Sequence, residues 1–226
     1  MLDEFFRLLG YGLCHQLPER SFFSGGYQLP VCARDTGIYL GFAVGLLVLR
    51  YLAGRTRPSD LPRWPVLVLI AAFVAAMGID GLTSYSGLRE TTNDLRLLTG
   101  LLTGWGLSAL TMPMINAQVW VEPGEGRVPE GGKQIALWLA ALALSFGVAR
   151  WVLPLTGVFY PLTLAAAILV TFGAVNLVFV GLIPRFERRA RRFRDLWLVL
   201  LIAQVLTIAE LAGAAWLRSF AESLLL

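Results

Sequence analysis

The 226-residue sequence is poor in charge, cysteine and histidine, and it has no extended hydrophilic stretch. Charged residues make up 15% of the chain, hydrophobic residues make up 57%, and the mean hydropathy is +0.67. These values exclude an ordinary soluble globular protein and indicate an integral membrane protein. The start, Met1–Arg7, carries acidic residues and lacks a long apolar core, so we expect no cleavable signal peptide.

Apolar stretches occupy most of the chain, and six of them have roughly the 20 residues that a membrane-spanning helix needs. We therefore predict an all-α, polytopic transmembrane bundle that forms a single integrated domain over residues 36–226. Residues 1–35 are predicted to form an interfacial, extramembrane segment that contains the cysteines and the histidine. The predicted spans are 36–54, 64–80, 94–120, 135–153, 159–183 and 196–217.

Basic residues are concentrated in short loops between the spans. The densest run is Arg185–Arg194, and the loops 50–63 and 121–134 carry further basic residues. Such loops are typical of the cytoplasmic side of a membrane protein. We therefore predict a multi-pass protein of a bacterial inner (plasma) membrane with both termini extracytoplasmic. The net charge of +4 is explained by topology, so the expected partner is the lipid bilayer and not nucleic acid.

The two cysteines and the only histidine all lie in the segment before the first span. Cys14, His15, Cys32 and Asp35 offer thiolate, imidazole and carboxylate groups, which are the standard ligands of zinc or a similar divalent metal. Cys14 and His15 are adjacent, so both can bind one ion only where the backbone is irregular. The segment therefore predicts a metal site.

Other interpretations of this segment remain open from the sequence. Cys14 and Cys32 can form a structural disulfide in an oxidising compartment. Asp35 or Thr36 can be the N-cap of the first span, and His15 can simply donate a hydrogen bond to a neighbour. A C-x-x-C redox centre is excluded because position 35 is an aspartate.

The second polar concentration is the loop at 80–96. An even number of membrane crossings separates it from residues 14–35, so the two segments must lie on the same face of the membrane. Asn93 and Arg96 share one face of a helix and should point together. Arg89 and Arg96 beside Asp80 suit an anionic group such as phosphate or carboxylate.

Two charged residues lie inside predicted spans, Arg150 in the fourth and Glu210 in the sixth. An ionised side chain in a span needs a partner or water, so we expect Arg150 and Glu210 to pair near the same polar cavity. Asn176 is expected to form an interhelical hydrogen bond. Small residues at every fourth position predict close helix contacts at Gly37, Gly41 and Gly45, and at Gly100 and Gly104.

Three runs of sequence are similar to a known family: Cys14–Phe22, Gln28–Tyr39 and Asp80–Gly100. They resemble a family of bacterial and archaeal integral membrane proteins of unknown function that carries a CHQ…ERSF…CARCTG signature. The resemblance covers roughly residues 10–105, and this chain has Asp35 where the signature has a third cysteine. Aspartate can replace cysteine as a zinc ligand but not in disulfide exchange, so the departure favours a metal site or marks a degraded one.

The function that we expect is metal-dependent hydrolysis or group transfer on a lipid or isoprenoid-linked anionic substrate. Asp80 or Glu19 would act as the general base, and Arg96, the third expected catalytic residue, would hold the anionic headgroup together with Arg20 and Arg89. The expected substrate-binding residues are Arg20, Arg34, Arg89, Asn93, Arg150 and Glu210. The alternatives are a transporter of a metal ion or small anion, and a non-catalytic scaffold with a Cys14–Cys32 disulfide.

Overall fold

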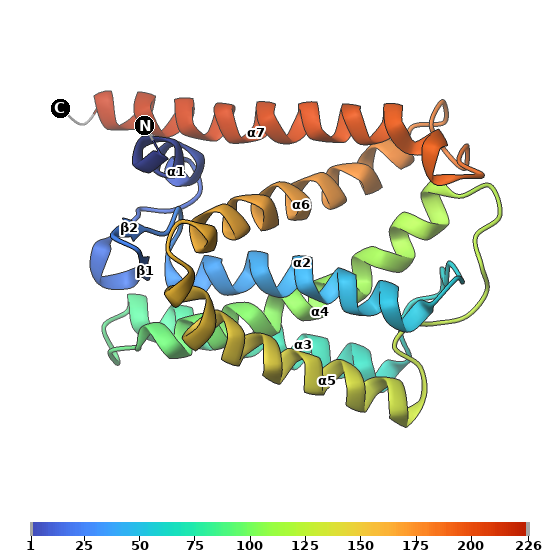
Figure 1. Cartoon of the computed structure of the whole chain (residues 1–226), viewed down its shortest axis with the longest axis horizontal. Helices are drawn as coiled ribbons and strands as arrows, with labels where there is room; N and C mark the ends of the chain where they lie inside the picture. The colour runs from blue at the N-terminus through green and yellow to red at the C-terminus, as the bar shows by residue number, and fades with distance from the viewer. Residues whose placement is uncertain (1, 225–226) are drawn as a thin grey trace.

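The structure, a computed structural model, describes residues 2–224 and consists almost entirely of helices. Six helical stretches in this part of the chain are long and apolar enough to cross a membrane, which confirms the predicted polytopic bundle. The long helices are α2 Ala33–Ala53, α3 Trp64–Tyr85, α4 Asn93–Val119, α5 Gly131–Gly147, α6 Phe159–Gly181 and α7 Trp197–Ser223 (Figure 1).

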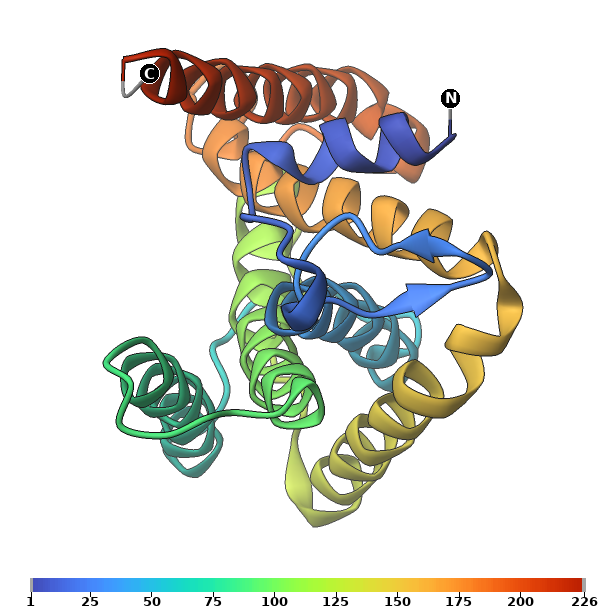
Figure 2. The same ribbon diagram turned by 90° about the vertical axis from the view of Figure 1, so that its left-hand side faces the viewer.

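The bundle has three inner and three outer helices. In α2, α4 and α6 between 44% and 61% of the membrane-spanning residues are buried inside the protein, against 17% in α3, α5 and α7. Figure 2 shows the inner helices at the centre of an end-on view, with α3, α5 and α7 around them. The outer helices therefore present most of their apolar surface to the surroundings, as lipid-facing helices do.

The N-terminal segment lies across one end of this bundle. It begins with α1 Leu2–Tyr11, which contacts α7 and α6 and whose buried residues are Phe6 and Gly10. A 3₁₀ turn at Pro18–Arg20 follows, and then an antiparallel hairpin of β1 Phe23–Ser24 and β2 Tyr27–Gln28. The glycines at 25 and 26 both have positive φ, which a tight two-residue hairpin turn requires.

Among the helix ends that differ from the sequence prediction, two matter for the site. The helix α2 begins at Ala33, so its N-cap is Cys32 and not Asp35 or Thr36. The helix α3 continues past Asp80 to Tyr85, and within this last part Thr83 Oγ1 donates to the carbonyl of Ile79 at 2.7 Å. Asp80 therefore lies on a helix, one turn before its end.

The contact between α2 and α4 is the most extensive in the bundle. A Cβ at Gly100 would lie 2.0 Å from the carbonyl oxygen of Arg34, and a Cβ at Gly104 would lie 2.0 Å from that of Ile38. Gly37, on the opposing helix, faces α4 just as closely. The predicted role of these glycines in close helix packing is therefore confirmed.

The α5 helix does not run straight into its loop. It ends in a π-helical turn, Val148–Val152, followed by a 3₁₀ turn, Leu153–Thr156. At the opposite end of the bundle a 3₁₀ turn, Phe193–Leu196, leads into α7. There the three basic loops meet, because Pro58 pairs with Gly124 and Trp120 with Ala190 through isolated β-bridges.

Candidate functional site

Cys14, Cys32 and Asp35 come together at the end of the bundle that the N-terminal segment covers. One ligand atom from each residue lies within 4.8 Å of the other two, and Cys32 Sγ lies 3.3 Å from Asp35 Oδ2. Zinc bonds of about 2.0–2.3 Å in tetrahedral geometry place ligand atoms about 3.5–3.8 Å apart. The three side chains therefore have the composition of a zinc-like site, and the distance between Cys32 Sγ and Asp35 Oδ2 is close to that between two ligands of one ion.

The loop that carries Cys14 is held in place by side-chain amides. Gln16 has a φ of 55°, and its amide donates to the carbonyl of Pro30 at 2.7 Å. The amide of Gln28 donates to the carbonyl of Gln16 at 2.8 Å. From the other end of the chain, Arg218 Nη1 donates to the carbonyl of Cys14 at 2.7 Å. The irregular backbone expected around Cys14 is present, and it aims the thiol at Cys32.

Both cysteines are free thiols in the structure. Hydrogen bonding from the Cys32 side chain, helped by the backbone N–H of Gln16, lowers the pKa of the Cys14 thiol to about 7. The same pairing, together with burial and the charge of Asp35, raises the pKa of the Cys32 thiol. The N–H of Cys32 also points at Cys14 Sγ, 3.3 Å away. Of the two sulfur atoms, Cys14 is therefore the one that more readily becomes a thiolate.

His15 does not belong to the three-residue group, although it follows Cys14 directly. It lines a cavity of about 280 Å³ together with both cysteines. It also lines a larger cavity, about 500 Å³, between α1, the hairpin and Arg218. Adjacent side chains diverge along the backbone, which explains why Cys14 and His15 do not point to the same place.

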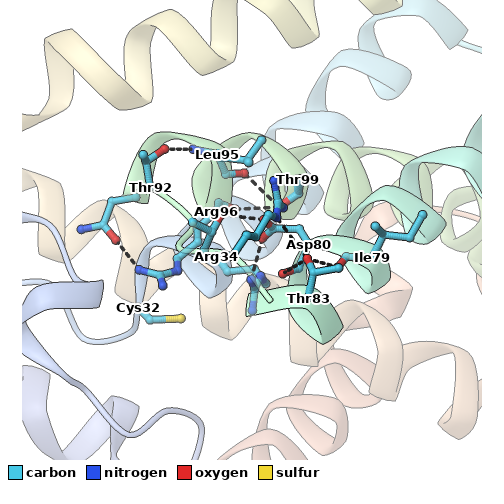
Figure 3. A network of polar contacts seen from close by, with 12 residues as sticks. Cys32, Arg34, Ile79, Asp80, Thr83, Thr92, Leu95, Arg96 and Thr99 are labelled. Carbon is cyan, nitrogen blue, oxygen red and sulfur yellow. Dashed lines mark hydrogen bonds and ion pairs between the residues drawn. The ribbon is translucent and has the colours of Figure 1, made fainter. Parts of the chain in front are cut away.

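Asp80 is the centre of an ion-pair cluster next to this group. Its Oδ2 accepts from Arg34 Nη2 at 2.6 Å, and its Oδ1 accepts from Arg89 and, at 2.6 Å, from Thr91 Oγ1. The Asp80 side chain is only 2% exposed. Figure 3 shows Arg34 and Asp80 meeting beside Arg96 and Cys32. The N-terminal segment and the loop after α3 therefore converge, as their placement on one membrane face predicted.

Asn93 ties α4 to the 3₁₀ turn of the N-terminal segment. Its amide donates to the carbonyl of Glu19 at 3.1 Å, and its Oδ1 accepts from Arg96 Nη1 at 2.9 Å. The predicted pairing of Asn93 with Arg96 is thus observed. Thr92 caps the helix, because its Oγ1 accepts from the N–H of Leu95 at 3.3 Å.

Several arginines lie near the cysteines, and not all of them are paired with a carboxylate. Arg20 and Arg96 form no ion pair among residues 2–224. The guanidinium of Arg20 lies 5.5 Å from the centre of the Tyr85 ring. The Nε of Arg34 is buried and has no hydrogen-bond partner in the described part of the chain.

The predicted ion pair between Arg150 and Glu210 is wrong. Arg150 Nε lies 2.5 Å from Asp94 Oδ1 at the start of α4, and its guanidinium lies over the Phe22 ring. Glu210 accepts instead from the Asn176 amide at 2.9 Å, within the contact between α6 and α7. Residues at similar depth in two helices pair only when the helices are neighbours, and α7 packs mainly on α6.

Three residues that contact the site, Thr91, Tyr85 and Arg218, are not among the site residues predicted from the sequence. Their contacts join Arg218 to Cys14 across 204 positions and Thr91 to Asp80 across 11. For Arg218 no local pattern could have given the contact. For Thr91 its proximity to Asp80 in a polar loop was a usable signal.

Fold and site together define a multi-pass helical membrane protein with a Cys/Asp cluster and a group of arginines at one end of the bundle. A family model described as "Predicted membrane protein (DUF2085)" matches residues 14–110, from Cys14 into α4. An uncharacterized protein of Methanothermobacter thermautotrophicus is 40% identical over 99 residues, which are 44% of this chain and 84% of that protein. The chain belongs to this family.

A second relative matches a similar length of the chain. An uncharacterized protein of Methanocaldococcus jannaschii is 32% identical over 108 residues, which are 48% of this chain and 67% of that protein. No solved structure matches the chain. The part of the chain that matches the family model contains the Cys/Asp cluster and the arginines around Asp80.

Proposed function

We propose that the protein binds zinc or a similar divalent metal through Cys14, Cys32 and Asp35. The observation that carries this proposal is that a thiol–thiol–carboxylate set from two separate segments lies within 4.8 Å. Two soft sulfur ligands favour zinc over magnesium or calcium, which take oxygen ligands. The cluster lies at the end of the bundle, where an ion can reach it without crossing the apolar core.

A three-ligand set leaves one position of a tetrahedral metal open. Catalytic zinc sites keep such a position for water or substrate, whereas structural sites fill all four. Both cysteines border the cavity of about 280 Å³, so the open position can face space that a small group can enter. This arrangement supports a catalytic metal site more than a structural one.

The arginines indicate the charge of the substrate. Arg20 borders the cavity, and Arg96 is bonded only to the neutral amide of Asn93 among the residues described. Guanidinium groups bind phosphate and carboxylate through paired hydrogen bonds. We infer that the substrate carries such an anionic group, on a lipid or isoprenoid that reaches the site from the membrane surface.

The proposed reaction is hydrolysis or group transfer assisted by the metal, which lowers the pKa of a bound water. Asp80 holds Arg34 and Arg89 in place, since both of its oxygens already accept hydrogen bonds. It is therefore better suited to positioning these arginines than to accepting a proton. Glu19 and His15 lie beside the cavity or on its adjoining turn and are the groups available for proton transfer.

The packing beneath the site favours a reaction at the surface over transport through the bundle. The backbones of α2 and α4 approach each other closely at Gly100, directly against the carbonyl of Arg34. An ion that passed between these two helices would meet backbone and apolar side chains. Thr99 and Thr103 donate to backbone carbonyls, Thr99 within α4 and Thr103 to α4 and to Phe73 of α3.

Cobalt(II) titration of the purified protein tests the ligand set. Thiolate bound to cobalt gives a near-ultraviolet charge-transfer absorption that a carboxylate or water ligand does not. We expect this absorption in the wild type, its weakening in Cys14→Ser, and a lower cobalt affinity in Asp35→Asn. His15→Ala is the matched control and should retain the spectrum. Wild-type protein that binds cobalt without the thiolate absorption would contradict the proposal.

A further inference from the structure

A second cavity lies at the opposite end of the bundle from the cysteines. Its volume is about 360 Å³, within the range of small-molecule sites. Aliphatic and aromatic side chains form most of its wall, and two arginines and a few neutral polar groups complete it. The lining residues come from α2, α4, α6, the loop after α2 and the turn before α7, and include Ala43, Leu47, Arg50, Arg57, Val170 and Phe193.

The cavity is a groove that runs from the middle of the membrane toward its surface. On α2 it extends from Ala43 to Arg50, which is about 10 Å along the helix. Arg50 lies about 24 Å along the same helix from Arg34. This groove is therefore a separate site from the Cys/Asp cluster. Its apolar end lies inside the bundle, and its arginines lie at the end where the basic loops meet.

The two arginines at the mouth are not neutralised by the protein. Neither Arg50 nor Arg57 forms an ion pair in the part of the chain that the structure describes. Arg57 lies over the Trp120 ring at 3.5 Å, which fixes its guanidinium in the groove wall, and its Nη2 donates to the carbonyl of Arg191. Arg50 donates to the carbonyl of Gly54. A guanidinium has five N–H donors, so each keeps donors for an anion.

The groove also has an open side. Leu47 and Phe193 line it and yet are 70% and 62% exposed. Side chains that are both lining and exposed mark the rim of an opening on the outer surface of the bundle. Around a membrane helix this surface is covered by lipid. An acyl chain can therefore enter from the side, which a water-soluble ligand cannot do.

We propose that this groove binds an anionic phospholipid, with one acyl chain between α2, α4 and α6 and the phosphate at Arg50 and Arg57. Charge and shape both point to this occupant. The apolar walls of the groove suit an acyl chain and not a polar molecule. Its two arginines, which have no carboxylate partner among the described residues, suit a headgroup with net negative charge. Phe193 and Leu196 line the groove, so the bound lipid joins the turn before α7 to the inner helices.

Native mass spectrometry of the full-length protein tests the proposal, with phosphatidylglycerol and phosphatidylcholine added at equal concentration. The wild type should retain phosphatidylglycerol preferentially. Arg50→Gln and Arg57→Gln should each weaken that retention about fivefold. Arg55→Gln is the matched control, because Arg55 is exposed in the same loop and does not line the groove. Val170→Trp, which fills the groove from its open side, should reduce retention of both lipids.

Two results would overturn the proposal. One is equal retention of the two lipids by the wild type. The other is a preference for phosphatidylglycerol that survives in Arg50→Gln or in Val170→Trp, since this would place the lipid on the basic loops in general. The stacking of Arg57 on Trp120 can also support the fold. Thermal unfolding of each variant, compared with Arg55→Gln, separates loss of lipid from loss of folding.

Discussion

Nη2 of Arg34 lies 2.6 Å from Oδ2 of Asp80, and this ion pair joins two helices across 46 positions of sequence. Arg34 is two residues after Cys32, and Asp80 is one turn before the end of α3. The pair therefore locks the cysteine-bearing start of α2 to the polar end of α3. It explains how a short N-terminal segment and a distant loop form one site at the membrane surface.

Removing the Asp80 carboxylate should destabilise the protein. In Asp80→Asn the guanidinium groups of Arg34 and Arg89 lose their shared partner in a buried position, which typically costs about 3 kcal/mol. The measurement is the free energy of unfolding in detergent micelles. Asp60→Asn is the control, because the Asp60–Arg127 pair is exposed and 4.0 Å apart and should contribute about 0–1 kcal/mol. Equal effects of the two variants would mean that Asp80 does not anchor the site.

The contact between α2 and α4 should not tolerate a methyl group. In Gly104→Ala the new Cβ would lie 2.0 Å from the carbonyl oxygen of Ile38, so the helices must separate. We expect a loss of about 1–3 kcal/mol in the free energy of unfolding. Gly78→Ala provides the contrast: no neighbour lies within 4 Å of its Cβ, and alanine favours helix, so the same assay should show no loss of stability. A neutral Gly104→Ala would mean that the helices are not in contact there.

The sequence predicted the helices well and the partners of polar residues less well. Six spans follow from apolar length alone, and the small-residue spacing at Gly100 and Gly104 correctly indicated close packing. Both are local patterns that the chain carries within a single helix. The ends of helices were less accurate, because backbone caps such as that by Cys32 lack a side-chain signal.

Partners across the bundle depend on which helices are neighbours, and no local pattern contains that information. Arg150 and Glu210 lie at similar depths, but they face different helices and pair with Asp94 and Asn176 instead. The convergence of residues 14–35 with the loop at 80–96 was predictable because counting membrane crossings places them on one face. The identity of the atoms that meet there, Arg34 with Asp80 above all, required the three-dimensional arrangement.

Arg96 should contribute to the binding of an anion at the site. It is bonded to Asn93 and has no carboxylate partner among the described residues, so its charge is available to a ligand. We expect Arg96→Ala to weaken the binding of inorganic pyrophosphate about tenfold, as measured by isothermal titration calorimetry. Arg63→Ala, at the opposite end of the bundle, should leave binding unchanged. Similar affinities in the two variants would show that Arg96 does not contact the anion.

The measurement that tests the account most directly is the metal content of the purified protein. Elemental analysis of protein prepared without chelators should find about one zinc per chain in the wild type and a large loss in Cys32→Ser, with both variants folded by circular dichroism. The account predicts that the two thiols of the wild type are free of a disulfide by mass spectrometry. A wild type without bound metal, and with a Cys14–Cys32 bridge in place, would contradict it.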